Sequence, residues 1–158
     1  MDNNSVLRQI RYIFNFNDDR MMDLFRSGGL PTNRKILSNW LKQDEDPNYQ
    51  MIPDQHLAAF LNGLITYKRG KKDDIKQEPE LKLNNNIILR KLKIALNLKV
   101  EEMVDLFNIV GMVVSKHEIN AFFRKPGQNQ YRKCLDQYLR NFLFAMQKNY
   151  RDFKGNPT

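Results

Sequence analysis

Apolar residues recur at intervals of three and four along four segments in the first half of the chain. This spacing places the apolar side chains of each segment on one face of an α-helix. The four sets are Val6, Ile10, Ile13 and Phe14; Met21, Leu24 and Phe25; Leu37, Trp40 and Leu41; and Leu57, Phe60, Leu61 and Leu64. No stretch alternates with period two as a half-buried strand does, so the pattern predicts four helices and no sheet.

The second half of the chain repeats the first after a shift of 82 residues, which aligns residues 3–64 with residues 85–146 without a gap. The register holds at special positions: Gly29 matches Gly111, and the large ring of Trp40 matches Phe122. Self-similarity over such a length is the mark of a duplicated structural unit. The sequence therefore predicts an all-α protein made of two tandem copies of a four-helix unit.

The predicted organisation has four parts. The first helical repeat covers residues 1–67, a charged linker covers 68–83, the second helical repeat covers 84–150, and a tail covers 151–158. A unit of about 65 residues buries only about 60% of the surface that its unfolded chain exposes, so one repeat alone has marginal stability. We therefore expect the two units to pack together with approximate two-fold symmetry.

The composition is that of a folded protein, and it indicates the cellular compartment in which the protein works. Apolar residues make up 41% of the 158 residues, with 7 Gly and 6 Pro, which argues against disorder. The polar start, residues 1–6, lacks the runs of a secretory signal, and no apolar stretch approaches the roughly 18 residues that span a bilayer. The single cysteine, Cys134, lies opposite Ile52 in the repeat, as a small buried apolar residue would. We expect a cytoplasmic protein that does not enter membranes.

Three long strings are specific enough to identify a resemblance: FLNGLITYKRGK (residues 60–71), NNNIILRKLKIALNL (84–98) and CLDQYLRNFL (134–143). They are similar to the YehS-like family of bacterial conserved hypothetical proteins, and the similarity covers nearly the whole chain. The resemblance implies a small bacterial cytoplasmic protein with a duplicated domain of unknown function. It supplies no catalytic or ligand residues, so any mechanism has to come from this chain's own residues.

Residues suited to catalysis or to metal binding are scarce. His56 and His117 are the only histidines, and the duplication places them opposite Tyr138 and Lys35, which favours surface positions over a catalytic base. The sequence has no phosphate-binding glycine loop and no metal-ligand spacing. It therefore predicts a protein that is not an enzyme and that has no cofactor and no metal site.

Several polar residues recur at matching positions in both copies, and their first interpretation is structural. The pairs are Arg8 and Arg90, Asp23 and Asp105, Tyr49 and Tyr131, and Asp54 and Asp136. We expect each arginine to bridge two helices by an ion pair, Arg8 with Asp23 and Arg90 with Asp105. The other two Asp residues begin helices, where a carboxylate accepts backbone N–H groups. The tyrosine rings are expected to anchor the loops at residues 43–52 and 125–130.

The second and third helices of each copy also permit a nucleic-acid-binding interpretation. Residues 18–42 and 100–124 resemble a helix-turn-helix, although the turn is about two residues longer than in a tight motif. The polar face of the third helix and its flanks carry side-chain types that contact phosphates and base edges: Lys35, Lys42, Lys116, His117, Asn120, Arg124, Lys125, Arg132 and Lys133.

The charge is distributed unevenly between the two halves. Residues 1–82 carry 13 Lys and Arg against 12 Asp and Glu, a net charge of +1, whereas residues 83–158 carry 13 against 6, a net charge of +7. The basic excess therefore supports nucleic-acid binding mainly in the second copy.

Two hypotheses follow from the sequence. The missing catalytic set favours a non-enzymatic helical interaction module that binds a protein partner through its loops or grooves. The alternative is a nucleic-acid-binding protein that uses the helix-turn-helix-like corners, chiefly in the second repeat. Binding that weakens steeply as salt rises would separate the second hypothesis from the first.

Overall fold

The computed structural model describes residues 1–70 and 77–153, and within these ranges the chain forms eight α-helices and one short π-helix, with no strand. The chain divides into two compact units, Met1–Leu83 (unit 1) and Asn84–Thr158 (unit 2). The predicted all-α class and the tandem organisation are therefore confirmed.

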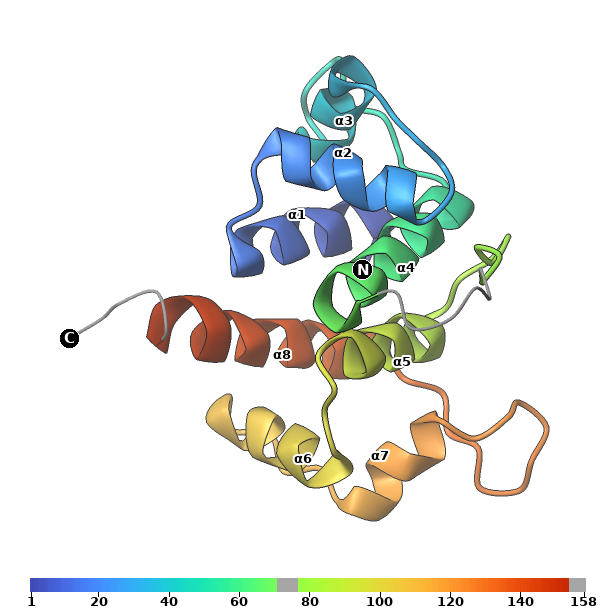
Figure 1. Cartoon of the computed structure of the whole chain (residues 1–158). Helices are drawn as coiled ribbons and strands as arrows, with labels where there is room; N and C mark the ends of the chain where they lie inside the picture. The colour runs from blue at the N-terminus through green and yellow to red at the C-terminus, as the bar shows by residue number, and fades with distance from the viewer. Residues whose placement is uncertain (71–76, 154–158) are drawn as a thin grey trace. The chain divides into compact units, whose positions relative to one another are not determined.

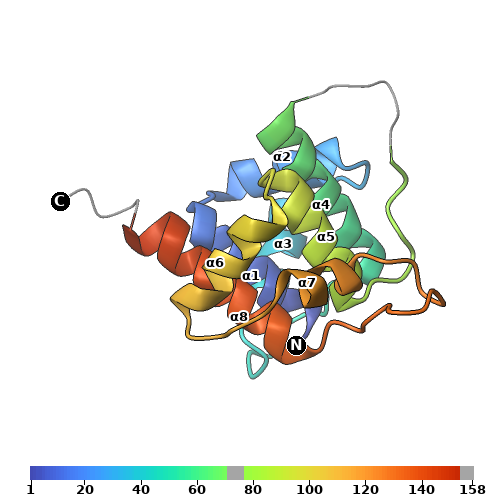
Figure 2. The same ribbon diagram turned by 90° about the horizontal axis from the view of Figure 1, so that it is seen from below.

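The described part of unit 1 forms four helices, in the order that the apolar pattern predicts (Figure 1). They are α1 (Asn3–Phe14), α2 (Asp18–Ser27), α3 (Arg34–Leu41) and α4 (Asp54–Arg69). Unit 2 repeats them with α5 (Asn85–Ala95), α6 (Val100–Ile109), α7 (Lys116–Phe122) and α8 (Asp136–Met146), and adds the π-helix η1 (Gln147–Phe153). In two views at right angles, the segment between α7 and α8 extends away from the helices of its unit (Figures 1 and 2).

Short polar side chains fix where five of the helices begin. The side-chain oxygen of the residue before each helix accepts a backbone N–H of the first turn, at 2.8 to 3.1 Å. These capping residues are Asp2, Asn17, Asn33, Asn84 and Ser115. Such a bond satisfies one of the N–H groups that have no partner inside the helix. Because Asp2 caps α1, Asn4 is left inside the first turn, where its side chain is available for other contacts.

The aromatic core is built twice with the same ring pairs. Phe25 and Phe60 have ring centroids 5.0 Å apart in unit 1, and their counterparts Phe107 and Phe142 are 5.8 Å apart in unit 2. A second pair joins the third helix to the fourth: Trp40 with His56 at 5.4 Å, and Phe122 with Tyr138 at 5.1 Å. His56 is therefore a half-buried packing residue rather than the surface residue that the sequence suggests.

The α2–α4 crossing in unit 1 depends on two glycines. A Cβ atom added to Gly63 would overlap the backbone carbonyl of Leu24, and one added to Gly28 would overlap the carbonyl of Ala59. The two helix backbones therefore touch, which a larger residue at either position would prevent. Unit 2 has Val110 and Ala145 at the matching positions, so this close approach belongs to unit 1.

Two predicted boundaries differ from the structure. Helix α4 continues through Arg69 into the predicted linker, because the chain meets no helix-breaking residue before Gly70, whose φ is +81°. The π-helix η1 continues to Phe153, three residues into the predicted tail. Residues 71–76 of the linker and 154–158 of the tail lie outside the described residues. Among the described helices, none is long and apolar enough to cross a membrane.

Candidate binding loops

Long irregular segments connect the third helix to the fourth helix in each unit. We call residues 42–53 the first loop and residues 124–135 the second loop. The two loops share their backbone hydrogen bonds at matching positions. Gln50 N–H bonds to the carbonyl of Asn39 at 3.2 Å, and Arg132 N–H bonds to the carbonyl of Ala121 at 3.1 Å. Each loop is thus tied back to the helix that precedes it.

A buried asparagine on the first helix of each unit holds the loop in place. Asn4, which is 0% exposed, donates from Nδ2 to the carbonyls of Trp40 and Gln50 at 2.9 and 2.8 Å. Its Oδ1 accepts the backbone N–H of Ile52 at 3.0 Å. One amide therefore satisfies three backbone groups from the end of α3 and from the first loop, and all of its hydrogen-bonding atoms are used.

The second unit contains the same arrangement. Asn86, which is 3% exposed, donates to the carbonyls of Phe122 and Arg132 at 3.0 and 2.8 Å and accepts the N–H of Cys134 at 2.9 Å. We call Asn4 and Asn86 the loop clamps. This role could not be predicted from the sequence, because an asparagine near a helix start resembles a cap.

The residue before each clamp makes a second repeated contact. Asn3 donates to the carbonyl of Ile52 at 3.1 Å and to Asp54 Oδ1 at 2.6 Å, and Asn85 makes the matching bonds to Cys134 and Asp136 at 3.0 and 2.8 Å. Asp54 and Asp136 are the first residues of α4 and α8, as predicted. Their expected capping role is wrong, since neither helix has a side-chain cap. The carboxylates accept these amide N–H groups, and Asp54 Oδ2 also accepts the backbone N–H of Leu83 at 2.8 Å, outside its own helix.

The two repeated arginines also serve the loops rather than the expected ion pairs. Arg8 Nη1 donates to the carbonyl of Lys42 at 2.9 Å, and Arg90 Nη2 donates to the carbonyl of Phe123 at 3.0 Å. Both carbonyls lie where the third helix ends and its last C=O groups have no partner within the helix.

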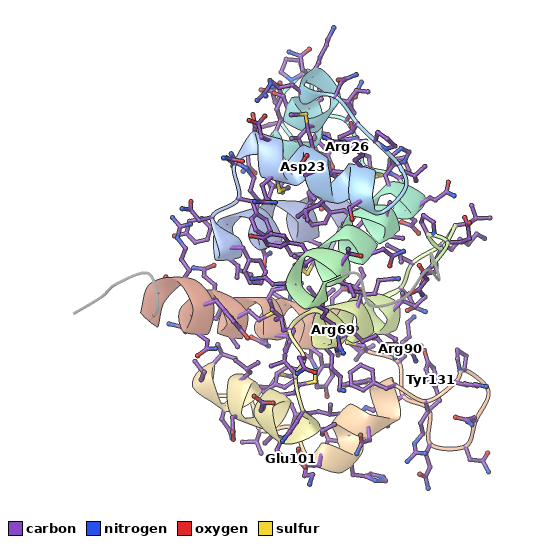
Figure 3. The ribbon with its side chains drawn as sticks, viewed as in Figure 1. Asp23, Arg26, Arg69, Arg90, Glu101 and Tyr131 are labelled. Atoms are coloured by element: carbon purple, nitrogen blue, oxygen red, sulfur yellow. The ribbon has the colours of Figure 1, made fainter. Side chains whose placement is uncertain are left out.

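The expected partner of Arg8 is engaged elsewhere. Asp23 pairs with Arg26 on its own helix at 2.7 Å, and both are labelled on α2 in Figure 3. Asp105, the counterpart of Asp23, is an exposed residue of α6. The predicted Arg8–Asp23 bridge is therefore wrong, because the guanidinium of Arg8 bonds to the carbonyl of Lys42 and to Ser5 Oγ, and not to Asp23.

The tyrosines of the two loops are half-exposed, and each backbone N–H closes a turn. Tyr49 N–H bonds to the carbonyl of Asp46 at 3.0 Å, and Tyr131 N–H bonds to the carbonyl of Gln128 at 3.1 Å. The pKa of Tyr49 is raised above its ordinary value by partial burial and by the nearby carboxylates of Asp2 and Asp44. The first loop is thus an acidic environment.

Although the loops are held alike, they carry opposite charges. The first loop has one lysine against three acidic residues, a net charge of −2, whereas the second loop has two lysines, two arginines and no acidic residue, a net charge of +4. The loop tips also differ in conformation, because Gly127 and Gln130 have φ of +93° and +81° while the matching residues of the first loop do not have positive φ. The two copies therefore share the hydrogen bonds at the loop ends and differ in the charge and conformation of the loop tips.

The helix-turn-helix-like corners are less basic than their sequence suggests. Six residues connect α2 to α3 and α6 to α7, longer than the three or four of a tight motif, as predicted. In both corners the first residue of the third helix pairs with an acidic residue of the second helix: Arg34 with Asp19, and Lys116 with Glu101, each at 2.7 Å. The hydrogen bond from Lys116 is the main reason why the pKa of Glu101 lies below its ordinary value. Positive charge at the start of each third helix is thus already matched by a carboxylate.

The structure separates the predicted nucleic-acid-binding residues into different places. Lys35 is exposed on α3, and Lys42 Nζ lies 3.0 Å from Ser38 Oγ. Lys116, His117 and Asn120 are exposed on α7. The remaining four, Arg124, Lys125, Arg132 and Lys133, belong to the second loop.

Two basic residues that were not predicted for this role join the second loop from α5. One is Arg90, and the other is Lys93, whose Nζ lies 5.8 Å from the ring centre of Phe123, the residue before the second loop. We call the set Arg90, Lys93, Arg124, Lys125, Arg132 and Lys133 the basic end of unit 2. In Figure 3, Arg90 and the loop residue Tyr131 are labelled in one part of unit 2, away from Glu101. Spacings of four and seven residues from Asn86 give the signal that could have found Arg90 and Lys93, because they put both on the helix face of the clamp.

The remaining candidates for chemistry are structural. Cys134 is buried, and this burial is the main reason why its pKa is raised to about 12. A thiol with such a pKa is a poor nucleophile near neutral pH. Within the described residues, no group of three His, Cys, Asp or Glu side chains is placed to hold a metal ion.

Comparison with known proteins agrees with the duplication. The model of a family described as a protein of unknown function, DUF1456, matches residues 3–70 and 85–152 separately. The uncharacterized protein YehS of Escherichia coli (strain K12) is 36% identical over 156 residues, which cover 98% of this chain and 100% of that protein. No solved structure matches the chain. The resemblance to the YehS-like family is confirmed.

Proposed function

Because the chain belongs to the DUF1456 family of proteins of unknown function, its role has to be argued from its own geometry, and we propose that it is a non-enzymatic interaction module. Its two loops would be the surfaces that bind macromolecular partners in the cytoplasm. The observation that carries the proposal is the pair of loop clamps. They hold both loops by the same three hydrogen bonds, while the exposed side chains of the loops differ in charge.

The physical argument rests on preorganisation. A loop whose backbone is fixed by buried hydrogen bonds loses little conformational entropy when a partner binds, so more of the contact energy appears as affinity. Loops on a rigid scaffold are also where binding residues concentrate. A buried polar residue has to be fully satisfied to be tolerated, and both clamps meet this requirement.

The alternative function, nucleic-acid binding through the helix-turn-helix-like corners, has weaker support. The residues that start α3 and α7 are Arg34 and Lys116, and each is paired with a carboxylate. In helix-turn-helix proteins this end of the helix approaches the base edges. A carboxylate there opposes the approach of phosphates.

Loop-charge variants of the whole chain test the proposal. The first-loop variant is Asp44→Asn with Glu45→Gln, the second-loop variant is Lys125→Gln with Lys133→Gln, and the control is Lys35→Gln with Lys116→Gln, which removes two charges outside the loops. Each tagged chain is crosslinked in cells of its own source and purified with and without nuclease. We expect partners recovered with the original chain to be lost with one or both loop variants and kept with the control. Partners retained by both loop variants would refute the proposal.

A further inference from the structure

We infer that the basic end of unit 2 binds the phosphate backbone of single-stranded nucleic acid. The inference rests on the proposed function, because it names the partner class of one of the two loops. It departs from the helix-turn-helix hypothesis in location: the site lies where α7 ends and the second loop begins, with α5 beside it.

Backbone hydrogen bonds bring the basic side chains together. The loop returns to α7 through Arg132, whose N–H bonds to the carbonyl of Ala121 at 3.1 Å, and Asn86 bonds to the carbonyls of Phe122 and Arg132. The two basic pairs of the loop, residues 124–125 and 132–133, therefore flank one fixed point of backbone. Arg90 reaches the same point from α5 through the carbonyl of Phe123.

Carboxylates compensate little of this charge. Arg132 Nη1 lies 3.6 Å from Glu118 Oε2, and Arg132 also donates to the hydroxyl of Tyr138 at 3.2 Å. Lys125 and Lys133 are exposed, and within the described part of the chain neither forms an ion pair. Among the described residues, Glu118 is the one acidic residue that forms an ion pair with these six basic side chains, and such an excess of positive charge is typical of a surface that binds a polyanion.

Two features favour a single strand over a duplex. The rings of Phe123 and Tyr131 are half-exposed among the basic side chains, and such rings provide stacking surfaces for unpaired bases. A duplex that received α7 in its groove would bring its phosphates towards the start of α6, where Glu101 and Glu102 are exposed.

Unit 1 provides an internal comparison. Its loop is held by the same clamp but carries a net charge of −2, with Asp44 and Glu45 exposed. We therefore expect the first loop to contribute nothing to nucleic-acid affinity, although the two units share a fold.

The test is fluorescence anisotropy with the whole chain and a labelled single-stranded oligonucleotide of about 16 nucleotides. If about four of the six side chains contact phosphates, the slope of log affinity against log salt is about −2.8 for a single strand. Affinity should then fall about 50-fold between roughly 50 and 200 mM salt. The variant Lys125→Gln with Lys133→Gln should halve the slope to about −1.4, a loss of only about 7-fold over the same range, and should bind more weakly at low salt.

The matched control is Lys35→Gln with Lys116→Gln, which removes the same net charge from the starts of the third helices. It should bind as the original chain does, and circular dichroism should show that both variants fold. No binding at low salt, a larger loss in the control than in the loop variant, or tighter binding of a duplex of the same length would each refute the inference. If oligonucleotides fail to bind while the loop variants still lose their crosslinked partners, the inference fails and the proposed function stands. If neither depends on the loops, both fail.

Discussion

Replacement of the clamp in unit 1 should destabilise that unit strongly. The substitution Asn4→Ala removes two donors from the carbonyls of Trp40 and Gln50 and the acceptor of the Ile52 N–H. Each hydrogen bond contributes about 1 kcal/mol net, and a buried N–H left without a partner costs about 1 kcal/mol or more. We therefore expect a loss of about 3 kcal/mol or more in the free energy of unfolding. For a unit of this size, that corresponds to a fall of roughly 12 °C or more in Tm.

The substitution Asn4→Asp should be worse than Asn4→Ala despite its nearly unchanged size. The carboxylate can still accept the N–H of Ile52, but its second oxygen would face the carbonyl oxygens of Trp40 and Gln50 without a proton to share. A buried charge with no donor partner is more costly than a missing amide. The order of stability should therefore be Asn4, then Ala, then Asp.

The assay is urea unfolding followed by the fluorescence of Trp40, the single tryptophan of the chain, which lies in unit 1 and contributes an acceptor to the clamp. Asn48→Ala provides the control, because Asn48 is an exposed residue of the same loop and surface changes usually stay within about 0.5 kcal/mol. If Asn4→Ala shifts the free energy of unfolding by less than about 1 kcal/mol, or no more than Asn48→Ala, the clamp does not hold the loop as we describe.

Three further predictions use other parts of the molecule. Gly63→Ala should destabilise the chain by about 1 to 3 kcal/mol in urea unfolding, because the new Cβ would overlap the backbone of α2. A neutral effect would show that α2 and α4 can move apart to accept an alanine, the residue that unit 2 has at the matching position 145. Cys134, with its pKa of about 12, should resist a thiol reagent at pH 8 in the folded chain and react once urea unfolds it, and equal rates would contradict its burial. The Glu101 carboxylate should titrate below the ordinary range of glutamate by NMR and return towards it in Lys116→Gln. Since the pKa of Glu101 is lowered in the folded chain, its contribution to stability is present above the ordinary glutamate pKa and is lost as pH falls through the lowered value; an unchanged titration in Lys116→Gln would exclude the ion pair as the cause.

The helices and their duplication could be predicted because they depend on patterns that are local in sequence. Apolar spacing alone located all four helices of each unit, and the shift of 82 residues paired Phe25 with Phe107 and Phe60 with Phe142. These rings then form the same contacts in both units. The apolar spacing of a helix can be recognised within a single segment, and the repeat provides a second, matching segment for each helix.

The loop contacts could not be predicted because their partners leave no mark in the sequence. Arg8 binds a backbone carbonyl, a group that every residue has and that no sequence pattern marks. The predicted ion pair with Asp23 relied on the opposite charge of that side chain, which the sequence does show. Asn4 is joined to groups 36 to 48 residues away, again through the backbone. The pairing of Lys116 with Glu101 depends on the path of the turn between α6 and α7, which the helical pattern does not specify.

The loop clamps have a consequence for engineering this scaffold. Asn4 and Asn86 bind backbone groups at the ends of each loop and make no hydrogen bond to a loop side chain. The residues between those ends can therefore be replaced without changing the bonds that the loop clamps make. Transplanting the tip of one loop into the other unit should transfer the charge and side chains of that loop and leave the supporting helices intact. A gene that carries the frame twice can thus acquire two specificities from one architecture, with one copy free to vary while the other keeps its task.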